Sequence, residues 1–121
     1  MEIIVLGLSH KSAPIEIREK LSFSAKTLNP ALLSLNEYPS IEENIILSTC
    51  NRVEIYASVS DARKAVEEIE DFLSRFHKIE AGFFKECLYS FSGPEALRHL
   101  FRVASSLDSM MVGETQIFGQ L

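Results

Sequence analysis

The chain has 121 residues, with 12 Lys or Arg against 17 Asp or Glu, so its formal net charge is −5. Together with 46% hydrophobic residues, these figures predict one ordinary globular domain and exclude a large two-domain enzyme. The acidic balance argues against coating of nucleic acid by bulk phosphate neutralisation, and the sequence lacks any apolar run long enough to span a bilayer.

Strands and helices are expected to follow one another along the first part of the chain. Residues 3–8 are apolar or Gly at consecutive positions, which predicts a central strand covered on both faces. The pattern breaks before Pro14, and a short helix is expected over 15–21. A second helix is expected over 30–36, with Asn29 as its N-cap and a proline in its first turn.

The middle of the chain predicts two strands and the clearest helix. β-Branched and alternating apolar residues predict strands at 45–47 and 53–59, on either side of residues 48–52. Apolar residues then recur at helical spacing over 62–76, with charged residues on the opposite side. A further strand is expected at 88–91.

The last helix is predicted after Ser92, which forms a Ser-x-x-Glu capping box with Glu95. We expect this helix to turn four apolar residues toward the core: Leu97, Leu100, Phe101 and Ala104. Another apolar helical pattern begins near Glu114 and still continues at Leu121, which indicates a piece of a longer chain.

This order of elements predicts the fold class. The sequence β-α-β-β-α-β-α, with two long helices packing on one side of the sheet, is typical of an α+β fold. We expect a ferredoxin-like split βαβ sandwich followed by additional C-terminal helices, all formed by residues 1–121 as one domain.

Cys50 is the most informative position because it lies between two predicted strands, where a side chain can meet solvent. A reactive thiol must also be ionised, and Arg52 supplies positive charge two residues away. Alternatively, Cys50 is a small buried hydrophobic residue, as most cytosolic cysteines are, and the pattern leaves both interpretations open. Cys87 is expected in the core, and both cysteines are expected to be free thiols in a reducing, cytoplasmic compartment.

The three histidines differ in their predicted surroundings. At about 100° per residue, His99 points with Arg102 and Ser106, away from the apolar stripe of its helix, so we expect it to lie off the core. It is either a solvated surface residue or borders a cleft, where an imidazole can hold a carbonyl or move a proton. His10, in a loop, has a weaker claim to the same role. His77 ends a helix and is expected to interact with the helix dipole.

Cofactor motifs are sparse in this sequence. Gln116 and Gln120 lie four residues apart, so in a helix they present their amides on one face. The Cys and His residues show no paired-ligand spacing, which predicts no metal site. Neither a G-x-G-x-x-G nor a P-loop pattern occurs, so we expect no dinucleotide site within this domain.

Three separated regions resemble the N-terminal catalytic domain of glutamyl-tRNA reductases. The matching segments are 7–14 (GLSHKSAP), 48–54 (STCNRVE) and, in the last region, 99–104 (HLFRVA), 107–110 (LDSM) and 113–120 (GETQIFGQ). They follow the order of the family and extend over the whole chain. The resemblance implies an oxidoreductase that uses NADPH to reduce glutamate esterified to its transfer RNA, giving glutamate-1-semialdehyde for tetrapyrrole and porphyrin synthesis.

The resemblance also implies roles for particular residues. Cys50 matches the nucleophile, whose thiolate releases the transfer RNA and leaves a glutamyl thioester. Arg52 suits a two-pronged grip on the glutamate carboxylate. His99 matches a position important for activity, with carbonyl polarisation and proton transfer both open. The positions that match substrate contacts are Thr49, Asn51, Arg52, Ser109, Glu114, Thr115, Gln116 and Gln120.

Members of this family continue into an NADPH-binding domain and a helical dimerisation domain, so we expect this chain alone to lack reductase activity. The implied partners are glutamyl-tRNA, glutamate-1-semialdehyde aminomutase and a second copy of the full-length enzyme, without a membrane. Thr115 stands where Pro is more common, and Ser12 where Thr is usual.

Two other interpretations of the sequence compete with this resemblance. The first is a non-catalytic α+β regulatory or assembly module, in which Cys50 merely closes a turn. The second is a Cys-His hydrolase, which requires Cys50 and His99 to lie close enough to share a proton.

Overall fold

The computed structural model describes the backbone of residues 2–110 and the side chains of residues 2–106. Its strands are β1 (Glu2–Ser9), β2 (Ile41–Ser48), β3 (Arg52–Val59) and β4 (Tyr89–Ser92). Its α-helices are α1 (Ile15–Leu21), α2 (Ala25–Leu35), α3 (Ala62–His77) and α4 (Pro94–Met110). Two 3-10 turns, η1 (Ala81–Phe83) and η2 (Lys85–Cys87), lead into β4.

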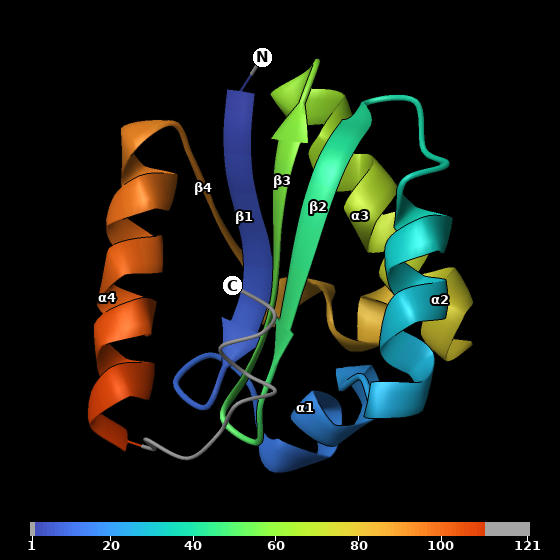
Figure 1. The fold of residues 1–121 in the computed structure, drawn as a ribbon. Helices are drawn as coiled ribbons and strands as arrows, with labels where there is room; N and C mark the ends of the chain where they lie inside the picture. Colours follow the sequence, from blue (N-terminus) through green and yellow to red (C-terminus); the bar gives the residue numbers. More distant parts are fainter. Residues whose placement is uncertain (1, 111–121) are drawn as a thin grey trace.

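The strands of the described residues form one antiparallel sheet in the order β2-β3-β1-β4 (Figure 1). β1 is central, as its unbroken apolar run predicted, and its residues from Ile4 to Ser9 are buried. The α+β class is therefore confirmed, together with an antiparallel four-stranded sheet. The more specific ferredoxin-like assignment stays a prediction.

Helices cover both faces of this sheet. On one face, Ile55 of β3 joins Phe72 of α3 in the main core, to which α1 and α2 also contribute. On the other face, Val5 and Tyr56 pack against Ala96 of α4. Figure 1 shows α4 on one side of the sheet and α2 and α3 on the other. The prediction that the two long helices share one side is wrong, because the strands present apolar side chains on both faces and each face needs a cover.

The start of α2 is set by a capping box rather than by its proline. The N–H of Thr27 donates to the Ser24 hydroxyl at 3.3 Å, and the Thr27 hydroxyl accepts from the N–H of Ser24 at 2.9 Å. The helix consequently begins at Ala25, and Pro30 lies inside it. The predicted cap at Asn29 is wrong because an earlier side chain already satisfies the first turn.

The turn from β4 into α4 depends on Gly93. Its N–H donates to the carbonyl of Ile3 at 2.8 Å, and its φ of 60° lies in the left-handed region that favours glycine. The carbonyl of Gly93 accepts from the N–H of Leu97 at 3.3 Å, so Gly93 caps a helix that starts at Pro94. The predicted capping box on Ser92 is wrong, because Ser92 is still part of the sheet.

His77 lies against the main core instead of acting as a cation at the end of α3. Its ring centroid is 4.6 Å from that of Phe23 and 5.5 Å from that of Phe76. Burial lowers its pKa below 6.5, an effect that a hydrogen bond with the backbone of Leu21 partly opposes. The Nε2 atom has no hydrogen-bond partner among the described residues. The folded protein therefore disfavours a proton on this imidazole, contrary to the predicted dipole interaction.

This lowered pKa predicts that the domain loses stability as the pH falls below about 6.5. In that range the unfolded chain binds a proton at His77 more readily than the folded chain does. We expect His77→Gln to lose less unfolding free energy than wild type between about pH 7 and about pH 5.5, measured by urea denaturation at both values. The matched control is His10→Gln at an exposed position. An identical pH dependence of His77→Gln and wild type would contradict this prediction.

Candidate functional site

Cys50 lies in the turn between β2 and β3, and its side chain is exposed. Thr49 closes this turn through its N–H, which donates to the carbonyl of Arg52 at 2.8 Å. The Thr49 hydroxyl also accepts from the N–H groups of Asn51 and Arg52, at 3.1 and 3.2 Å. The buried interpretation of Cys50 is therefore wrong: the local hydrogen bonds fix the backbone and leave the thiol facing solvent.

Two other segments hold the same turn. Arg18 of α1 donates from Nη1 to the carbonyl oxygen of Cys50 at 2.9 Å, and the N–H of His10 donates to the carbonyl of Asn51 at 2.7 Å. Arg18 brings a second guanidinium to the turn besides Arg52, and its Nε has no hydrogen-bond partner among the described residues. Arg18 was not predicted as a site residue, because it lies 32 positions from Cys50 and outside any chemical motif.

A buried carboxylate lies on the sheet face beneath α4. Glu54 is 0% exposed, and its Oε1 accepts from the Tyr56 hydroxyl at 2.7 Å. Its Oε2 accepts from the Tyr89 hydroxyl, contacts Nε2 of His99 and pairs with Nη1 of Arg52 at 3.2 Å. We call these five residues the Glu54 cluster. It places Arg52 and His99, both predicted site residues, around one carboxylate.

Gly7 makes room for this cluster. In the sheet it stands between its partners Glu54 on β3 and Tyr89 on β4. A Cβ atom at Gly7 would lie 2.4 Å from the carbonyl oxygen of Val53 and 2.8 Å from Cγ of Glu54. Because Gly7 has no side chain, the Glu54 and Tyr89 side chains can meet above β1.

The cluster places His99 beneath α4 rather than in solvent. The His99 side chain is only 13% exposed, and its ring centroid lies 5.4 Å from that of Tyr89 and 5.0 Å from that of Phe91. The prediction that His99 lies off the core is wrong. The physical reason is that a buried carboxylate requires hydrogen-bond donors, and His99 supplies one to Glu54 from a separate element.

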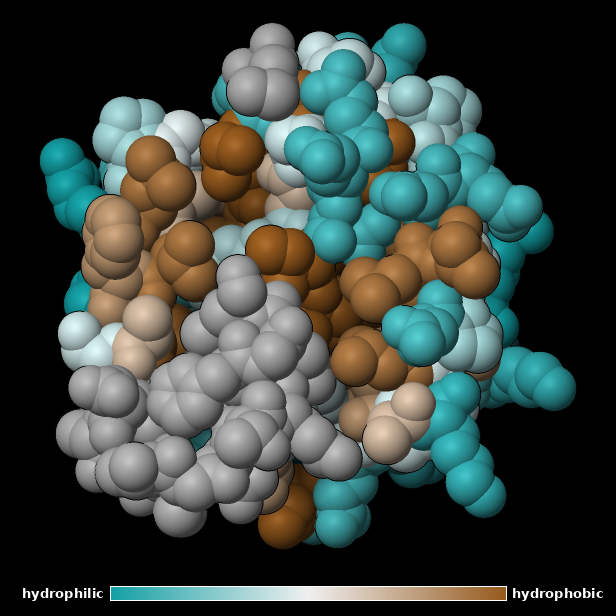
Figure 2. Space-filling view, viewed as in Figure 1, coloured by the Kyte–Doolittle hydropathy of each residue, from teal (hydrophilic) through white to brown (hydrophobic). Residues whose placement is uncertain are grey.

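The outer face of α4 carries apolar side chains that were predicted to be buried. Leu97 is 45% exposed and Phe101 68%, whereas Ala96 and Val103 are buried against the sheet. Figure 2 shows apolar residues gathered on the side of the molecule where α4 lies in Figure 1. The predicted orientation of Leu97 and Phe101 is thus wrong, since the helix is rotated to bring His99 onto Glu54.

Among the described helices, none is long and apolar enough to cross a membrane.

The tyrosines of the cluster remain hydrogen-bond donors. Burial, followed by the negative charge and hydrogen bonding of Glu54, raises the pKa of both Tyr56 and Tyr89 above 10.0, and Arg52 opposes this only in part. Arg52 is 18% exposed, so it lies at the border between the buried cluster and solvent. Arg52 thus links the buried cluster to the start of β3, which directly follows the Cys50 turn.

The structure brings one part of the predicted site together and leaves the rest outside its description. Cys50 shares a turn with Thr49, Asn51 and Arg52, while His99 is linked to Arg52 through Glu54. No hydrogen bond joins His99 to Cys50 among the described residues, so the shared proton required by a Cys-His hydrolase is not seen. Five predicted substrate contacts lie outside the described side chains: Ser109, Glu114, Thr115, Gln116 and Gln120. The helix expected from residue 114 also lies outside the described residues.

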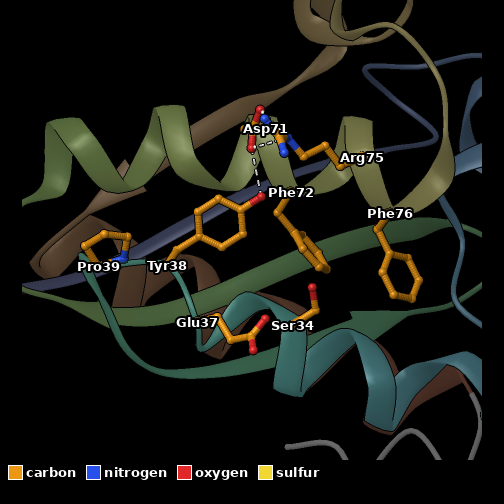
Figure 3. A pocket seen from close by; sticks show the side chains of 8 residues that line it. All are labelled: Ser34, Glu37, Tyr38, Pro39, Asp71, Phe72, Arg75 and Phe76. Atoms are coloured by element: carbon orange, nitrogen blue, oxygen red, sulfur yellow. Dashed lines mark hydrogen bonds and ion pairs between the residues drawn. The ribbon is translucent and has the colours of Figure 1, made fainter.

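Two grooves lie away from these residues. One, of about 450 Å³, runs between α2 and α3, where Tyr38 donates to Asp71 at 2.8 Å and Arg75 pairs with Asp71 at 3.0 Å (Figure 3). Burial and then the hydrogen bond to Asp71 raise the pKa of Tyr38 to about 12. The other, of about 550 Å³, follows the outer face of α4 beside Phe101 and Arg102. Among the residues that the structure describes, neither groove is lined by a predicted site residue. The described residues also contain no group of three or more His, Cys, Asp or Glu arranged to hold a metal ion.

These features define an α+β domain that presents an exposed thiol at a hairpin turn beside a buried carboxylate cluster. Comparison with known proteins assigns that domain to a family. The family model described as glutamyl-tRNA(Glu) reductase, N-terminal domain, matches residues 6–121. The chain belongs to this family.

Individual relatives agree with this assignment. Over its whole length the chain is 53% identical to the glutamyl-tRNA reductase of Pelotomaculum thermopropionicum and 55% identical to that of Thermodesulfovibrio yellowstonii. It covers 27% and 30% of those two proteins. The solved structure of glutamyl-tRNA reductase from Methanopyrus kandleri matches 98% of the chain with a TM-score of 0.62 and 36% identity, and the chain covers 26% of that structure.

Proposed function

We propose that this chain is the acyl-accepting domain of an enzyme that reduces glutamyl-tRNA to glutamate-1-semialdehyde at the entry to tetrapyrrole synthesis. The observation that carries the proposal is the exposed Cys50 thiol, in a tight turn whose Cys50 carbonyl accepts from the guanidinium of Arg18 and which Arg52 follows in sequence. Membership of the glutamyl-tRNA reductase family supports the choice of substrate. A positively charged, accessible environment is what a nucleophilic thiolate requires.

In the proposed reaction, the thiolate sulfur of Cys50 attacks the carbonyl carbon of the glutamyl ester. A C–S bond forms, and the C–O bond to the terminal ribose of the transfer RNA breaks. The departing ribose oxygen takes up a proton, and the glutamyl group remains on Cys50 as a thioester. A thioester has less resonance stabilisation than an ester, which makes its carbonyl a better acceptor for a hydride.

The residues around the turn have distinct proposed roles. Arg52 pairs with Glu54 through Nη1, and its remaining N–H groups can grip the side-chain carboxylate of the glutamyl group. Thr49 and Asn51 line the same turn and contact the substrate there. His99 polarises the ester carbonyl or gives a proton to the departing oxygen.

The described residues do not fit NADPH. A dinucleotide site of the usual kind needs parallel strands and a glycine-rich turn leading into a helix, whereas the strand pairs seen in residues 2–110 are antiparallel. The hydride step is therefore assigned to no residue of this domain. The cytoplasmic location, the homodimer and the aminomutase partner stay predictions.

The test is to trap the acyl group. The full-length protein carrying this chain is mixed with glutamyl-tRNA without NADPH, quenched rapidly in acid and digested for mass spectrometry. We expect the mass of one glutamyl group on the peptide that contains Cys50. Cys87→Ser, at a half-buried position, should keep this adduct, and Cys50→Ser should lose the thioester. A folded protein that binds glutamyl-tRNA but carries no glutamyl group on Cys50 would favour the non-catalytic module.

A further inference from the structure

The buried carboxylate of Glu54 calls for an explanation beyond packing. Its side chain is fully buried, and removing a charge from water is unfavourable unless hydrogen bonds and ion pairs replace the lost hydration. Apolar residues of similar volume often stabilise such a position as well as the charge does. The charged arrangement beneath α4 therefore points to a role in the chemistry of the adjacent turn.

The geometry of Oε2 indicates what that role is. This single oxygen pairs with Nη1 of Arg52 at 3.2 Å and contacts Nε2 of His99. An ionised carboxylate only accepts hydrogen bonds, so Nε2 of His99 carries the hydrogen in this contact. The proposed polarisation or proton transfer would then use Nδ1, which donates only when both ring nitrogens carry a hydrogen. One atom of Glu54 thus fixes the orientation of both groups that the proposed acyl transfer uses.

We propose that Glu54 is a positioning residue for transfer of the glutamyl group to Cys50. It acts through His99, whose ring it orients, and it holds Arg52 at the edge of the cluster. Tyr56 and Tyr89 fix the carboxylate in turn by donating to its two oxygens. This inference rests on the proposed function, because it concerns the rate at which Cys50 receives its acyl group.

Glu54→Gln tests the inference with little change of shape. The amide oxygen can replace Oε2 and accept from Arg52, His99 and Tyr89. The amide nitrogen can replace Oε1 and donate to Tyr56, whose hydroxyl also accepts hydrogen bonds. The substitution therefore keeps the shape but replaces the contacts of a carboxylate with Arg52 and His99 by the weaker contacts of a neutral amide, which hold the two side chains less firmly.

The control for this variant is Glu68→Gln on α3. Glu68 accepts from the N–H of Ser40 at 3.0 Å and from its hydroxyl at 2.9 Å. It is a half-buried, hydrogen-bonded glutamate on the other face of the sheet. It takes no part in the Glu54 cluster.

The rate of glutamyl transfer to Cys50 is measured in single turnovers with saturating glutamyl-tRNA and no NADPH, using the full-length protein. We expect Glu54→Gln to slow this rate about 100-fold and Glu68→Gln to change it less than about twofold. In a His99→Asn background, Glu54→Gln should slow it by less than about tenfold, because the contribution through His99 is then already lost and only that through Arg52 remains. Alkylation of Cys50 by iodoacetamide should not become slower, since Glu54→Gln leaves the positive charges of Arg18 and Arg52 in place.

If circular dichroism shows that the glutamine variant does not fold, Glu54→Asp is measured in its place. It keeps the charge but withdraws the carboxylate by one methylene group, and we expect a similar loss of rate. Transfer at the wild-type rate in the folded variant, or an equal loss in the His99→Asn background, would overturn the positioning role. A wild-type protein that forms no thioester would instead overturn the proposed function, and this inference with it.

Discussion

Replacing Glu54 by alanine is expected to lower the free energy of unfolding by about 3–5 kcal/mol. The substitution removes the acceptor of four donors beneath α4 and leaves the guanidinium of Arg52 without its partner. It also opens a cavity where the side chain was fully buried. Urea denaturation followed by circular dichroism measures the change.

The control is Glu42→Ala at an exposed position of β2, which should change the free energy of unfolding by less than about 0.5 kcal/mol. Similar losses for the two variants would mean that the Glu54 cluster adds nothing to the stability of the domain. A loss confined to Glu54→Ala would confirm that the cluster holds α4 on the sheet.

Gly7→Ala is expected to destabilise the domain by about 3 kcal/mol, although it adds only one methyl group. The new carbon would lie 2.4 Å from the carbonyl oxygen of Val53, a backbone atom within the β1–β3 ladder. That oxygen cannot retreat without disturbing the pairing of two central strands. Glu54 would also be displaced, because its Cγ would lie 2.8 Å from the added carbon.

Gly82→Ala is the matched control for Gly7→Ala, since a Cβ at Gly82 meets no atom within 4 Å. We expect it to leave the unfolding free energy unchanged or to raise it by about 0.4–1 kcal/mol through the unfolded chain. Thermal unfolding of both variants at one pH provides the comparison. If the two glycines tolerate alanine equally, the close approach at Gly7 has no energetic consequence.

The sequence predicted those elements whose periodicity is complete within one segment. The helix expected over 62–76 is α3, and the alternating residues over 53–59 are β3. The unbroken apolar run of 3–8 correctly placed β1 at the centre of the sheet. In each case the spacing of apolar residues within one segment indicates which side of that segment is buried.

The orientation of α4 was not predictable in the same way. Its most apolar stripe includes Leu97 and Phe101, which are exposed, whereas His99 faces the sheet. The reason is a partner on another element, since Glu54 must receive hydrogen bonds wherever it is buried. Hydrophobic periodicity depends only on the residues of the helix itself. It therefore does not indicate a polar group on a neighbouring element.

In the candidate site, too, features within one segment were predicted and contacts between distant segments were not. The turn around Cys50 and the neighbouring Arg52 were predicted because they are adjacent in sequence. The contacts of Arg18 with Cys50 and of His99 with Glu54 span 32 and 45 positions, so no local pattern contains them. One signal for Glu54 was available: on β3 it is in phase with Tyr56, on the face opposite Ile55.

The turn that carries Cys50 is attached to both helical layers of the domain. Arg18 reaches it from α1 on one face of the sheet, and Arg52 ties it through Glu54 to His99 of α4 on the other. A displacement of either layer would therefore change the orientation of the turn from which Cys50 acts in the proposed acyl transfer. A partner bound to the outer surface of α4 could therefore shift the Cys50 turn through His99, Glu54 and Arg52.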